Sequence, residues 1–492
     1  MTHRISRRRF LEDSAALLAI SALPVAASAG QAGSRRRVGP NDTIRVGCIG
    51  VRGQGSSHIN AYAGMNDAVV AAVCDCDTAF FDRAVRAVES RGKPAPKTYQ
   101  DIRRLLEDPE IDVVSVATPN HWHALAAIWA MQAGKDVYLE KPGSHNVTEG
   151  RRTVQVARRL GRICQIGTQS RASAGLREAI AFLHDGGIGK VRLARGLCYK
   201  TRASIGTAAG PQEPPATVDY DLWLGPAQRK PVRRRQFHYD WHWFWDYGNG
   251  DIGNQGIHEM DKARWGLGKQ TLPASVVALG GRFGYVDDAE TPNTMVAVFD
   301  YGDADLIFEV RGLVSRPPGD DRSWIALPGD ARLVGNLFYG DKGVLVMPSY
   351  SSATAFDNDG NQIRAFRGGG DHHRNFLAAC RSRKHSDLFA DCEEGHLSSA
   401  LCHLANLSYL RGEEARFDRR VAAFDGDRDA IESFDRFAEH LAATGARLTE
   451  GTYRLGRKLA IDARRERIAN DREANTLLTR EYRAGFAVPD RA

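Results

Sequence analysis

The chain has 492 residues, of which 42% are hydrophobic, and this is enough for two domains with a core each. Its formal charge is +7, from 67 basic and 60 acidic residues, and both signs are scattered along the sequence. A nucleic-acid partner usually requires Lys and Arg concentrated on one face or in one run, so this distribution argues against nucleic-acid binding.

The first 29 residues are typical of an export signal. A twin-arginine pattern at Ser6–Leu11 precedes an apolar run, Ala15–Ala27, and Ala27-Ser28-Ala29 has the small residues of a cleavage site. The apolar run is too short to span a bilayer. We therefore predict a twin-arginine signal peptide over residues 1–29, a periplasmic or otherwise exported protein, and no stable membrane insertion. Two alternatives stay open: a lipid-retained anchor, and a segment that is not cleaved.

After an Arg/Gly/Ser linker over residues 30–43, short apolar strands alternate with segments of helix length. Strands are predicted at Ile44–Ile49, Val69–Cys74, Val113–Ala117, Lys135–Glu140 and Arg162–Gly167, and helices at Ser57–Met65, Phe80–Arg91 and His121–Gln132, the last capped by Asn120. This alternation is that of a doubly wound α/β domain with a parallel sheet, predicted over residues 44–165.

Beyond about residue 165, alternating strands are separated by Gly, Pro and Asp turns. A helix is predicted at Leu176–Asp185, strands at Val191–Tyr199, Ser275–Phe283, Thr294–Asp300, Asp305–Val314 and Gly343–Met347, and further helices at His373–Arg383 and Gly395–Leu410. The pattern predicts a second, α+β domain with a large, mainly antiparallel sheet over residues 166–410. Residues 411–492 are predicted to form a partly helical extension.

A glycine-rich turn follows the first predicted strand. Gly50, Gly53 and Gly55 fall where a dinucleotide-binding turn lets the backbone approach a pyrophosphate at a helix N-terminus. Asp75 ends the next strand, where an acidic residue binds the ribose hydroxyls. Because Asp75 would repel a 2′-phosphate, NAD is favoured over NADP. The motif departs from its usual form at Arg52, which stands where a second glycine is expected.

Two segments carry a resemblance to a known family. Thr118–His123 (TPNHWH) and Ala133–Pro142 (AGKDVYLEKP), with its Glu-Lys-Pro triplet, resemble the glucose-fructose oxidoreductase/inositol dehydrogenase family, usually written Gfo/Idh/MocA. The resemblance extends over nearly the whole chain after the signal and is closest to exported bacterial members. It implies an NAD(P)-dependent oxidoreductase that acts on a secondary hydroxyl of a sugar, glycoside or polyol. It also implies a homo-oligomer, either a dimer or a tetramer.

The resemblance assigns the two catalytic residues. Oxidising a secondary alcohol needs a base for the hydroxyl proton and donors that hold the oxygen as charge develops. The family lysine, here Lys141, lies beside the nicotinamide, where desolvation should lower its pKa. His258 takes the family's catalytic His or Tyr position, with Asp261 as its acidic partner on the same helix face. Inositol dehydrogenases carry an Asp four residues before this His, where this chain has Asn254.

The remaining predicted contacts lie in the same motif segments and their neighbours. Cofactor contacts are predicted for Gly50, Arg52, Gly53, Gly55, Asp75, Thr118, Asn120, His123, Glu140, Lys141 and Gln169. Substrate contacts are predicted for Arg171, His242, Asn254 and Asp261.

The segment from Phe237 to Asp261 is unusually rich in aromatic residues and histidines. Trp241, Trp243 and Trp245 alternate as on a strand, so they either pack the sheet against a helix or stack on a sugar or nicotinamide ring. His238, which has the opposite parity, either contacts the substrate or makes a structural hydrogen bond. Six histidines fall near this inferred pocket, and imidazole suits zinc, but they show no tight ligand spacing, so no metal is predicted.

The predicted compartment bears on the reaction, because no ready NAD pool exists outside the cytoplasm. A working enzyme should therefore retain its cofactor and regenerate it in place. One design couples oxidation of one sugar to reduction of another. An alternative is an NAD-retaining glycosidase that works by transient 3-keto oxidation and elimination, and a further alternative is a non-catalytic sugar-binding protein.

Overall fold

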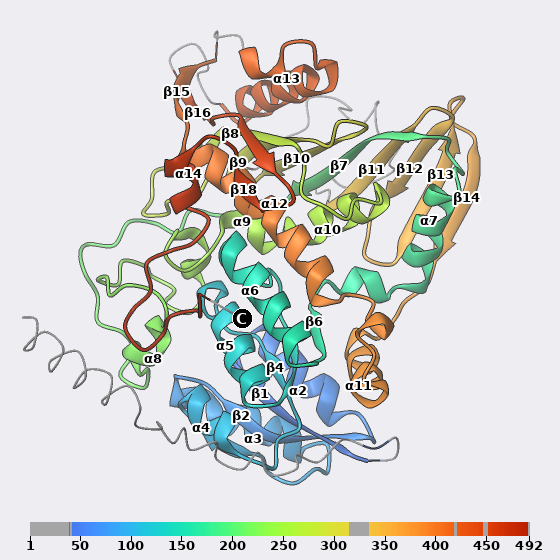
Figure 1. The fold of residues 1–492 in the computed structure, drawn as a ribbon. Helices are drawn as coiled ribbons and strands as arrows, with labels where there is room; N and C mark the ends of the chain where they lie inside the picture. The colour runs from blue at the N-terminus through green and yellow to red at the C-terminus, as the bar shows by residue number, and fades with distance from the viewer. Residues whose placement is uncertain (1–38, 40–41, 314–333, 418–420, 446–450, 491–492) are drawn as a thin grey trace, which may run out of the picture. The chain divides into compact units, whose positions relative to one another are not determined.

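Two sheets organise the part of the chain that the structure describes, a computed structural model covering residues 39, 42–313, 334–417, 421–445 and 451–490 (Figure 1). The predicted signal peptide, residues 1–29, and most of the linker lie outside the described residues. No helix in the described ranges combines the length and the apolar character needed to cross a membrane.

The first sheet has six parallel strands in the order β3-β2-β1-β4-β5-β6. The strands are β1 (Ile44–Ile49), β2 (Ala68–Cys74), β3 (Lys97–Tyr99), β4 (Val113–Val116), β5 (Asp136–Leu139) and β6 (Cys164–Ile166). The helices between them are α2 (Gln54–Ala63), α3 (Phe81–Glu89), α4 (Ile102–Glu107), α5 (Asn120–Gln132) and α6 (Val147–Arg159). The predicted doubly wound domain is confirmed; β3, α4 and α6 were not predicted.

Helices cover both faces of this sheet. Val113 and Val114 are neighbours on β4, and they enter different core clusters because successive side chains of a strand point to opposite faces. One cluster packs α4, α5 and α6 against the sheet, and the other contains residues of α2, α3 and α11 (His372–Ser382). The loops at the carboxyl ends of the strands are therefore left to form a binding site.

The second sheet has twelve strands and is mostly antiparallel, with one parallel pair, β7 and β10. Its strands are β7 (Val191–Tyr199), β8 (Ser275–Gly281), β9 (Thr294–Asp300), β10 (Asp305–Arg311), β11 (Val334–Gly340), β12 (Gly343–Met347), β13 (Ser352–Asp357), β14 (Gln362–Arg367), β15 (Glu413–Arg416), β16 (Thr452–Leu455), β17 (Leu459–Asp462) and β18 (Arg467–Ile468). The predicted large, mainly antiparallel sheet is confirmed.

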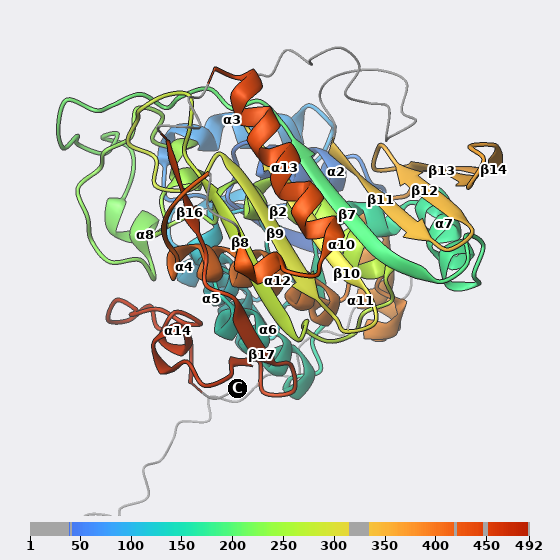
Figure 2. The ribbon, with the colours of Figure 1, turned by 90° about the horizontal axis from the view of Figure 1, so that it is seen from above.

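The C-terminal 80 or so residues contribute to this second sheet. Strands β16 and β17 pair with β8, and β15 pairs with β16. Helix α13 (Arg428–Ala443) lies across one face of the sheet, where Phe437 and Leu441 share a core cluster with Val277 and Val298 (Figure 2). The short α14 (Arg472–Thr476) follows the last strand.

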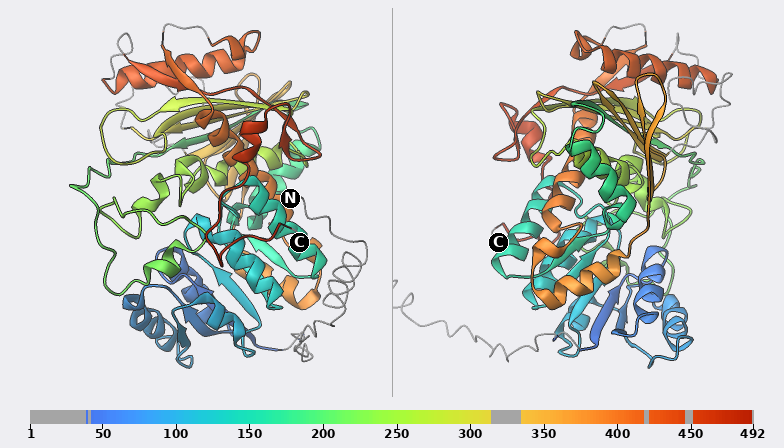
Figure 3. Two further views of the ribbon diagram at one scale, coloured as in Figure 1. Left: turned by 60° about the vertical axis from the view of Figure 1, so that its left-hand side comes forward. Right: turned by 90° about the vertical axis from the view of Figure 1, so that its right-hand side faces the viewer.

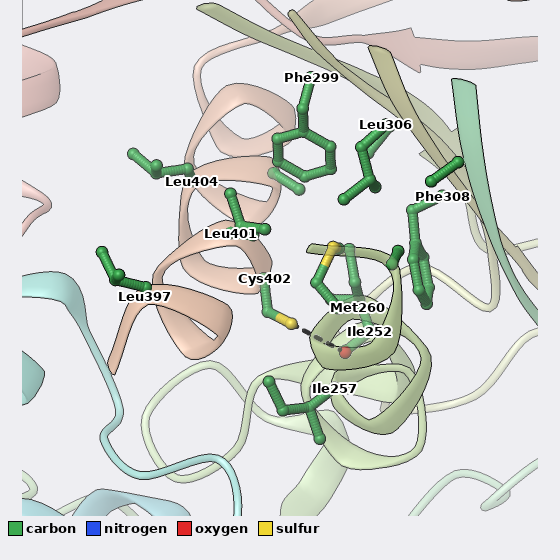
Figure 4. Close-up of a cluster of buried hydrophobic side chains, with 14 of the residues drawn as sticks. Ile252, Ile257, Met260, Phe299, Leu306, Phe308, Leu397, Leu401, Cys402 and Leu404 are labelled. Carbon is green, nitrogen blue, oxygen red and sulfur yellow. Dashed lines mark hydrogen bonds between the residues drawn. The ribbon is translucent and has the colours of Figure 1, made fainter. Parts of the chain in front are cut away.

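A layer of helices lies between the second sheet and the first domain. It contains α7 (Ala174–His184), α9 (Gly250–Asn254), α10 (Ile257–Gly266) and α12 (Cys392–Leu410). Met260 of α10 and Leu401 of α12 pack beneath Phe299 of β9, and the Cys402 thiol donates to the Ile252 carbonyl over 3.2 Å (Figure 4). This buried core fixes the position of α10, which carries His258.

Candidate active site

A cavity of about 360 Å³ lies at the carboxyl ends of β1, β2, β4 and β5. Its wall includes predicted site residues from both domains: Gly50, Arg52, Gly53, Asp75, Thr118, Asn120, His123, Glu140, Lys141, His242 and Asn254. Gly55, Gln169, Arg171, His258 and Asp261 are not part of that wall.

The turn after β1 needs glycine at two positions. Gly50 has φ +79°, and a Cβ there would lie 2.6 Å from the Ala117 carbonyl oxygen. A Cβ on Gly55 would lie 1.8 Å from the Gly50 carbonyl oxygen, so neither position accepts a larger residue. The side chain of Arg52 is exposed, with its guanidinium 4.6 Å from the centre of the Phe80 ring, and the turn accommodates it where a glycine was expected.

Several features of the cavity fit a dinucleotide. Helix α2 begins at Gln54 after Gly53, which has no side chain to cap it, so the amide groups of its first turn can meet a pyrophosphate. Asp75 follows β2, and its carboxylate accepts hydrogen bonds from the amides of Val51 (2.9 Å) and Asp77 (3.0 Å). Burial raises the pKa of Asp75. The Thr118 hydroxyl is buried and has no hydrogen-bond partner among the described residues.

Lys141 occupies the wall after β5. Its ammonium donates to the Asn254 carbonyl over 2.8 Å, and no ion pair among the described residues includes it. Desolvation lowers the pKa of Lys141, while the charges of Glu140 and Glu259 act in the opposite direction and that of Lys200 adds to the lowering. The lysine is therefore easier to deprotonate than one in water.

Glu140, the residue before the lysine, stays ionised. Burial alone would raise its pKa, but the hydrogen bond from His58 (3.2 Å), together with the charge of Lys141, lowers the pKa to about 2. The other ring nitrogen of His58 lies 2.9 Å from the Ser115 hydroxyl. His58 was not predicted from the sequence, because no local pattern indicates that a histidine on α2 contacts the residue that follows β5.

Two neutral imidazoles accompany Lys141. His242 stacks on Trp241 with ring centroids 3.7 Å apart, and burial with the charge of Lys141 lowers its pKa to about 3. His258 is only 6% exposed, and the centre of its ring lies 5.1 Å from that of the Tyr350 ring. The Nδ1 atom of His258 has no hydrogen-bond partner among the described residues. Burial and then the charge of Lys141 lower the His258 pKa well below its ordinary value.

Arg171 and Asp261 lie away from the cavity wall and contact each other. The guanidinium donates to both carboxylate oxygens over 2.8 to 3.0 Å, and the Ser398 hydroxyl donates to Asp261 over 2.7 Å. Arg171 is 4% exposed and Asp261 is 1% exposed. Gln169 starts the short helix η2 (Gln169–Ala172) that also carries Arg171.

His123 and Asn120 brace the wall. The His123 ring nitrogens lie 2.5 Å from the Pro142 carbonyl oxygen and 2.8 Å from that of Thr118. The predicted capping role of Asn120 is wrong, because Asn120 is the first residue inside α5 and Pro119 is the N-cap. The Asn120 side-chain amide instead donates to Asn249 Oδ1 over 3.0 Å.

The predicted strand through the tryptophans is also wrong. Asp240–Trp243 forms a 3₁₀ helix, η3, because local hydrogen bonds close the chain on itself. The Gln236 amide donates to Asp240 over 2.8 Å, and the Trp241 indole donates to the His238 carbonyl over 3.0 Å. The three tryptophans therefore do not share one face: Trp241 lines the cavity, and Trp243 is buried outside its wall.

Residues 217–243, termed here the roof segment, cover the cavity opposite the strand ends. They include α8 (Tyr220–Leu224), which lies beside the first domain (Figure 3). The Thr78 amide donates to Thr217 over 3.1 Å, the Asp219 amide donates to Cys76 over 2.9 Å, and His238 lies 2.8 Å from the Asp77 carboxylate. In the sequence, the contact between His238 and the first domain was indicated only by Asp77, which lies two residues after Asp75 and was given no role.

The described residues contain no group of three or more His, Cys, Asp or Glu side chains placed to hold a metal ion. All eight cysteines are free, and seven are buried. The chemistry open to the cavity is therefore that of its lysine, imidazoles and amides, together with whatever dinucleotide it binds.

Comparison with known families decides the relationship. Residues 44–168 match the model of the Gfo/Idh/MocA oxidoreductase family's NAD-binding Rossmann domain, and residues 189–302 match that of the family's C-terminal alpha/beta domain. The chain belongs to the Gfo/Idh/MocA oxidoreductase family. The family resemblance and the NAD-binding class predicted from the sequence are confirmed.

Curated relatives share a shorter region with the chain. A Glycosyl hydrolase family 109 protein of Shewanella pealeana is 33% identical over 179 residues, which are 33% of this chain and 39% of the relative. A second protein of that name, from Shewanella sp. strain MR-4, is 32% identical over 180 residues, again 39% of its length. The chain thus spans about two fifths of the length of these relatives.

Solved structures share the fold over three quarters of the chain. The WlbA dehydrogenase from Bordetella pertussis, in complex with NADH and UDP-GlcNAcA, has a TM-score of 0.52 at 20% identity and covers 74% of this chain and 96% of its own. Levoglucosan dehydrogenase in complex with NADH has a TM-score of 0.53 at 17% identity, with the same coverage of 74% and 96%. At these identities the likeness shows the fold alone.

Proposed function

We propose that the chain is an NAD-dependent oxidoreductase that acts on a secondary hydroxyl of a sugar, glycoside or polyol. The observation that carries this proposal is the position of Lys141, whose ammonium is held by one backbone carbonyl in the wall of the cavity that also contains the glycine turn. The relatives named Glycosyl hydrolase family 109 proteins support the substrate class.

Each side chain has a part in the proposed reaction. When bound, a nicotinamide supplies the acceptor for the hydride that leaves the substrate carbon. Lys141 takes the hydroxyl proton at Nζ, which its lowered pKa favours. The Asn254 amide and the neutral imidazole of His242 hold neighbouring hydroxyls, since both can donate or accept. An amide cannot take a proton, so the absence of a carboxylate at position 254 leaves proton transfer to Lys141 and His258.

The roof segment supports cofactor retention. The bonds from Thr217, Asp219 and His238 to the first domain hold residues 217–243 across the cavity, where they would hinder the exit of a bound dinucleotide. Several such bonds open together only rarely, so release should be slow. Retention would let one protein oxidise and then reduce without exchanging its cofactor.

The NAD-retaining glycosidase is the second candidate, and the Glycosyl hydrolase family 109 relatives favour it. In that cycle, oxidation at C3 acidifies the C2 proton, Lys141 or a neighbouring base removes it, the glycosidic oxygen leaves, water adds, and hydride returns to C3. The net change is hydrolysis without consumption of cofactor.

Absorbance in the reduced-nicotinamide band separates these candidates. Purified protein is mixed with glucose, galactose and their aryl glycosides. Stable reduction with a free sugar is the result expected of the oxidoreductase. Transient reduction that decays as the aryl group is released would contradict the oxidoreductase and support the glycosidase. No change in absorbance with any sugar would contradict both enzymes and support a non-catalytic sugar-binding protein.

We also propose export and self-association. The twin-arginine pattern of residues 1–29 supports export, and fractionation of cells that express the full chain tests it: retention of the full chain in the cytoplasm would contradict export. The family resemblance supports a dimer or tetramer, and light scattering that gives a monomer mass would contradict it.

A further inference from the structure

A second cavity, of about 280 Å³, lies outside the proposed active site. Helix α12 contributes His403, Asn406, Leu407 and Leu410 to its wall, and the chain that leaves α14, the red trace in Figure 1, contributes Leu477 and Thr479–Glu481. The remaining wall includes His145, Trp245 and Asn249. None of the residues that line this cavity lines the first one.

The wall holds polar groups whose hydrogen bonding is incomplete. Asn406, 5% exposed, donates through Nδ2 to the Asn249 carbonyl over 2.9 Å, but its Oδ1 has no partner among the described residues. Arg480 donates to the Asp246 carbonyl over 2.9 Å, while its Nε is likewise unpaired. Buried polar groups are usually satisfied, so these atoms point to a missing polar partner.

His145 adds a donor of defined tautomer. Its Nδ1 lies 3.3 Å from the Arg480 guanidinium, which can only donate, so Nδ1 accepts and the proton resides on Nε2. Burial lowers the pKa of His145 well below its ordinary value, so the ring is neutral. The wall thus offers both acceptors and donors, as a ligand rich in hydroxyl groups requires.

Two apolar side chains lie at the exposed edge of the cavity. Leu410 and Leu477, two of the large hydrophobic side chains exposed among the described residues, both line it, at 40% and 44% exposure. Trp245 is half-buried in the same wall, 6.5 Å from the Tyr409 ring. Exposed apolar groups gathered around a polar floor are typical of a ligand site rather than of ordinary surface.

We propose that this cavity is a second carbohydrate site, which takes one neutral sugar ring. The C–H face of the ring packs on Trp245 and the two leucines, and its hydroxyls meet Asn406, His145 and Arg480. The volume of about 280 Å³ suits one monosaccharide. Asn249 forms the partition to the first cavity, because it accepts from Asn120 in that wall and donates to the His145 carbonyl over 3.0 Å.

Fluorine NMR of protein labelled with 5-fluorotryptophan tests this site. The chain has eight tryptophans, and Trp245→Phe identifies the resonance of Trp245. NAD-loaded protein is titrated with glucose and with N-acetylglucosamine. We expect the Trp245 resonance to shift saturably with at least one of these sugars, and the response to persist in Lys141→Ala, whose chemistry is disabled. That persistence separates this inference from the proposed reaction.

Two variants complete the test. Leu410→Ala with Leu477→Ala removes the two exposed leucines from the cavity wall and should weaken the Trp245 response at least tenfold. Phe389→Ala, at an exposed aromatic outside both cavities, should leave it unchanged. A Trp245 resonance that neither sugar moves, or equal binding by the double variant, would overturn the second site.

Discussion

Lys141 and the Arg171–Asp261 pair place charge in two different settings within one protein. Asp261 is surrounded by donors from Arg171 and Ser398 and is 1% exposed. Lys141 has a backbone carbonyl as its hydrogen-bond partner and faces a cavity. Both positions were predicted as site residues from the sequence.

This difference shows which buried charged groups can take part in proton transfer. A charge whose hydrogen bonds are complete cannot change protonation state without leaving its partner uncompensated in a poorly solvated place. A lysine held by one carbonyl loses little when it gives up a proton, and desolvation already favours the neutral form. On this account, Lys141 moves protons and Arg171–Asp261 holds η2 against α10.

Replacing the lysine should have the largest effect on activity. Lys141→Ala is expected to lower turnover by roughly 10² to 10⁴ fold if the ammonium moves the proton. Steady-state kinetics on a reactive sugar measures this, with bound NAD quantified in both proteins as the control. Unchanged turnover with full cofactor would remove Lys141 from the mechanism.

Breaking the ion pair should act on stability instead. Asp261→Ala leaves Arg171 without its nearest carboxylate, although Glu394 lies 3.1 Å away, and should reduce the free energy of unfolding by about 3–5 kcal/mol. Denaturant titration measures the loss. The folded variant should keep its kcat/KM, and a collapse of kcat/KM at full stability would instead support the substrate contact predicted from the sequence.

The roof segment offers an intermediate effect. His238→Ala removes the side-chain bond to Asp77, which is worth about 1.5–3 kcal/mol when one partner is charged, so NAD should dissociate at least about tenfold faster. The rate at which NAD passes to an excess of a scavenging dehydrogenase reports this. Release at the wild-type rate would show that the roof does not retain the cofactor.

The smallest effects are two pH shifts of opposite sign. Turnover should rise with pH as Lys141 becomes neutral, with a midpoint at its pKa. The charge of Glu140 raises the pKa of Lys141, so Glu140→Gln should move the acid limb of the pH–turnover profile to lower pH. The charge of Lys200 lowers the pKa of Lys141, so Lys200→Met should move that limb to higher pH. Shifts in one direction for both variants would contradict Lys141 as the titrating group.

In both sheets, the strands that are short apolar runs between turns were predicted well. The predicted bounds of β1, β7, β9 and β12 coincide with the observed ones. Strand β11, VGNLFYG, carries two glycines and an Asn in a short run, and β14, QIRAFR, is mostly exposed, so neither gives an apolar alternation. Their positions depend on neighbouring strands rather than on their own composition.

The site residues divide in the same way: those fixed by a local motif were predicted, and the contacts between distant residues were not. The glycine turn and Lys141 are set by local geometry that a motif preserves. The contacts of His58 with Glu140 and of His238 with Asp77 join residues 82 and 161 positions apart, so no local pattern reports them. The pairing of Arg171 with Asp261 likewise became visible only once η2 and α10 were placed side by side.

Native mass spectrometry of the purified full chain tests the central claim most directly. A protein that retains NAD beneath the roof segment should keep one dinucleotide per chain through repeated buffer exchange. A chain that carries none, and gains none when NAD is added, would contradict the account.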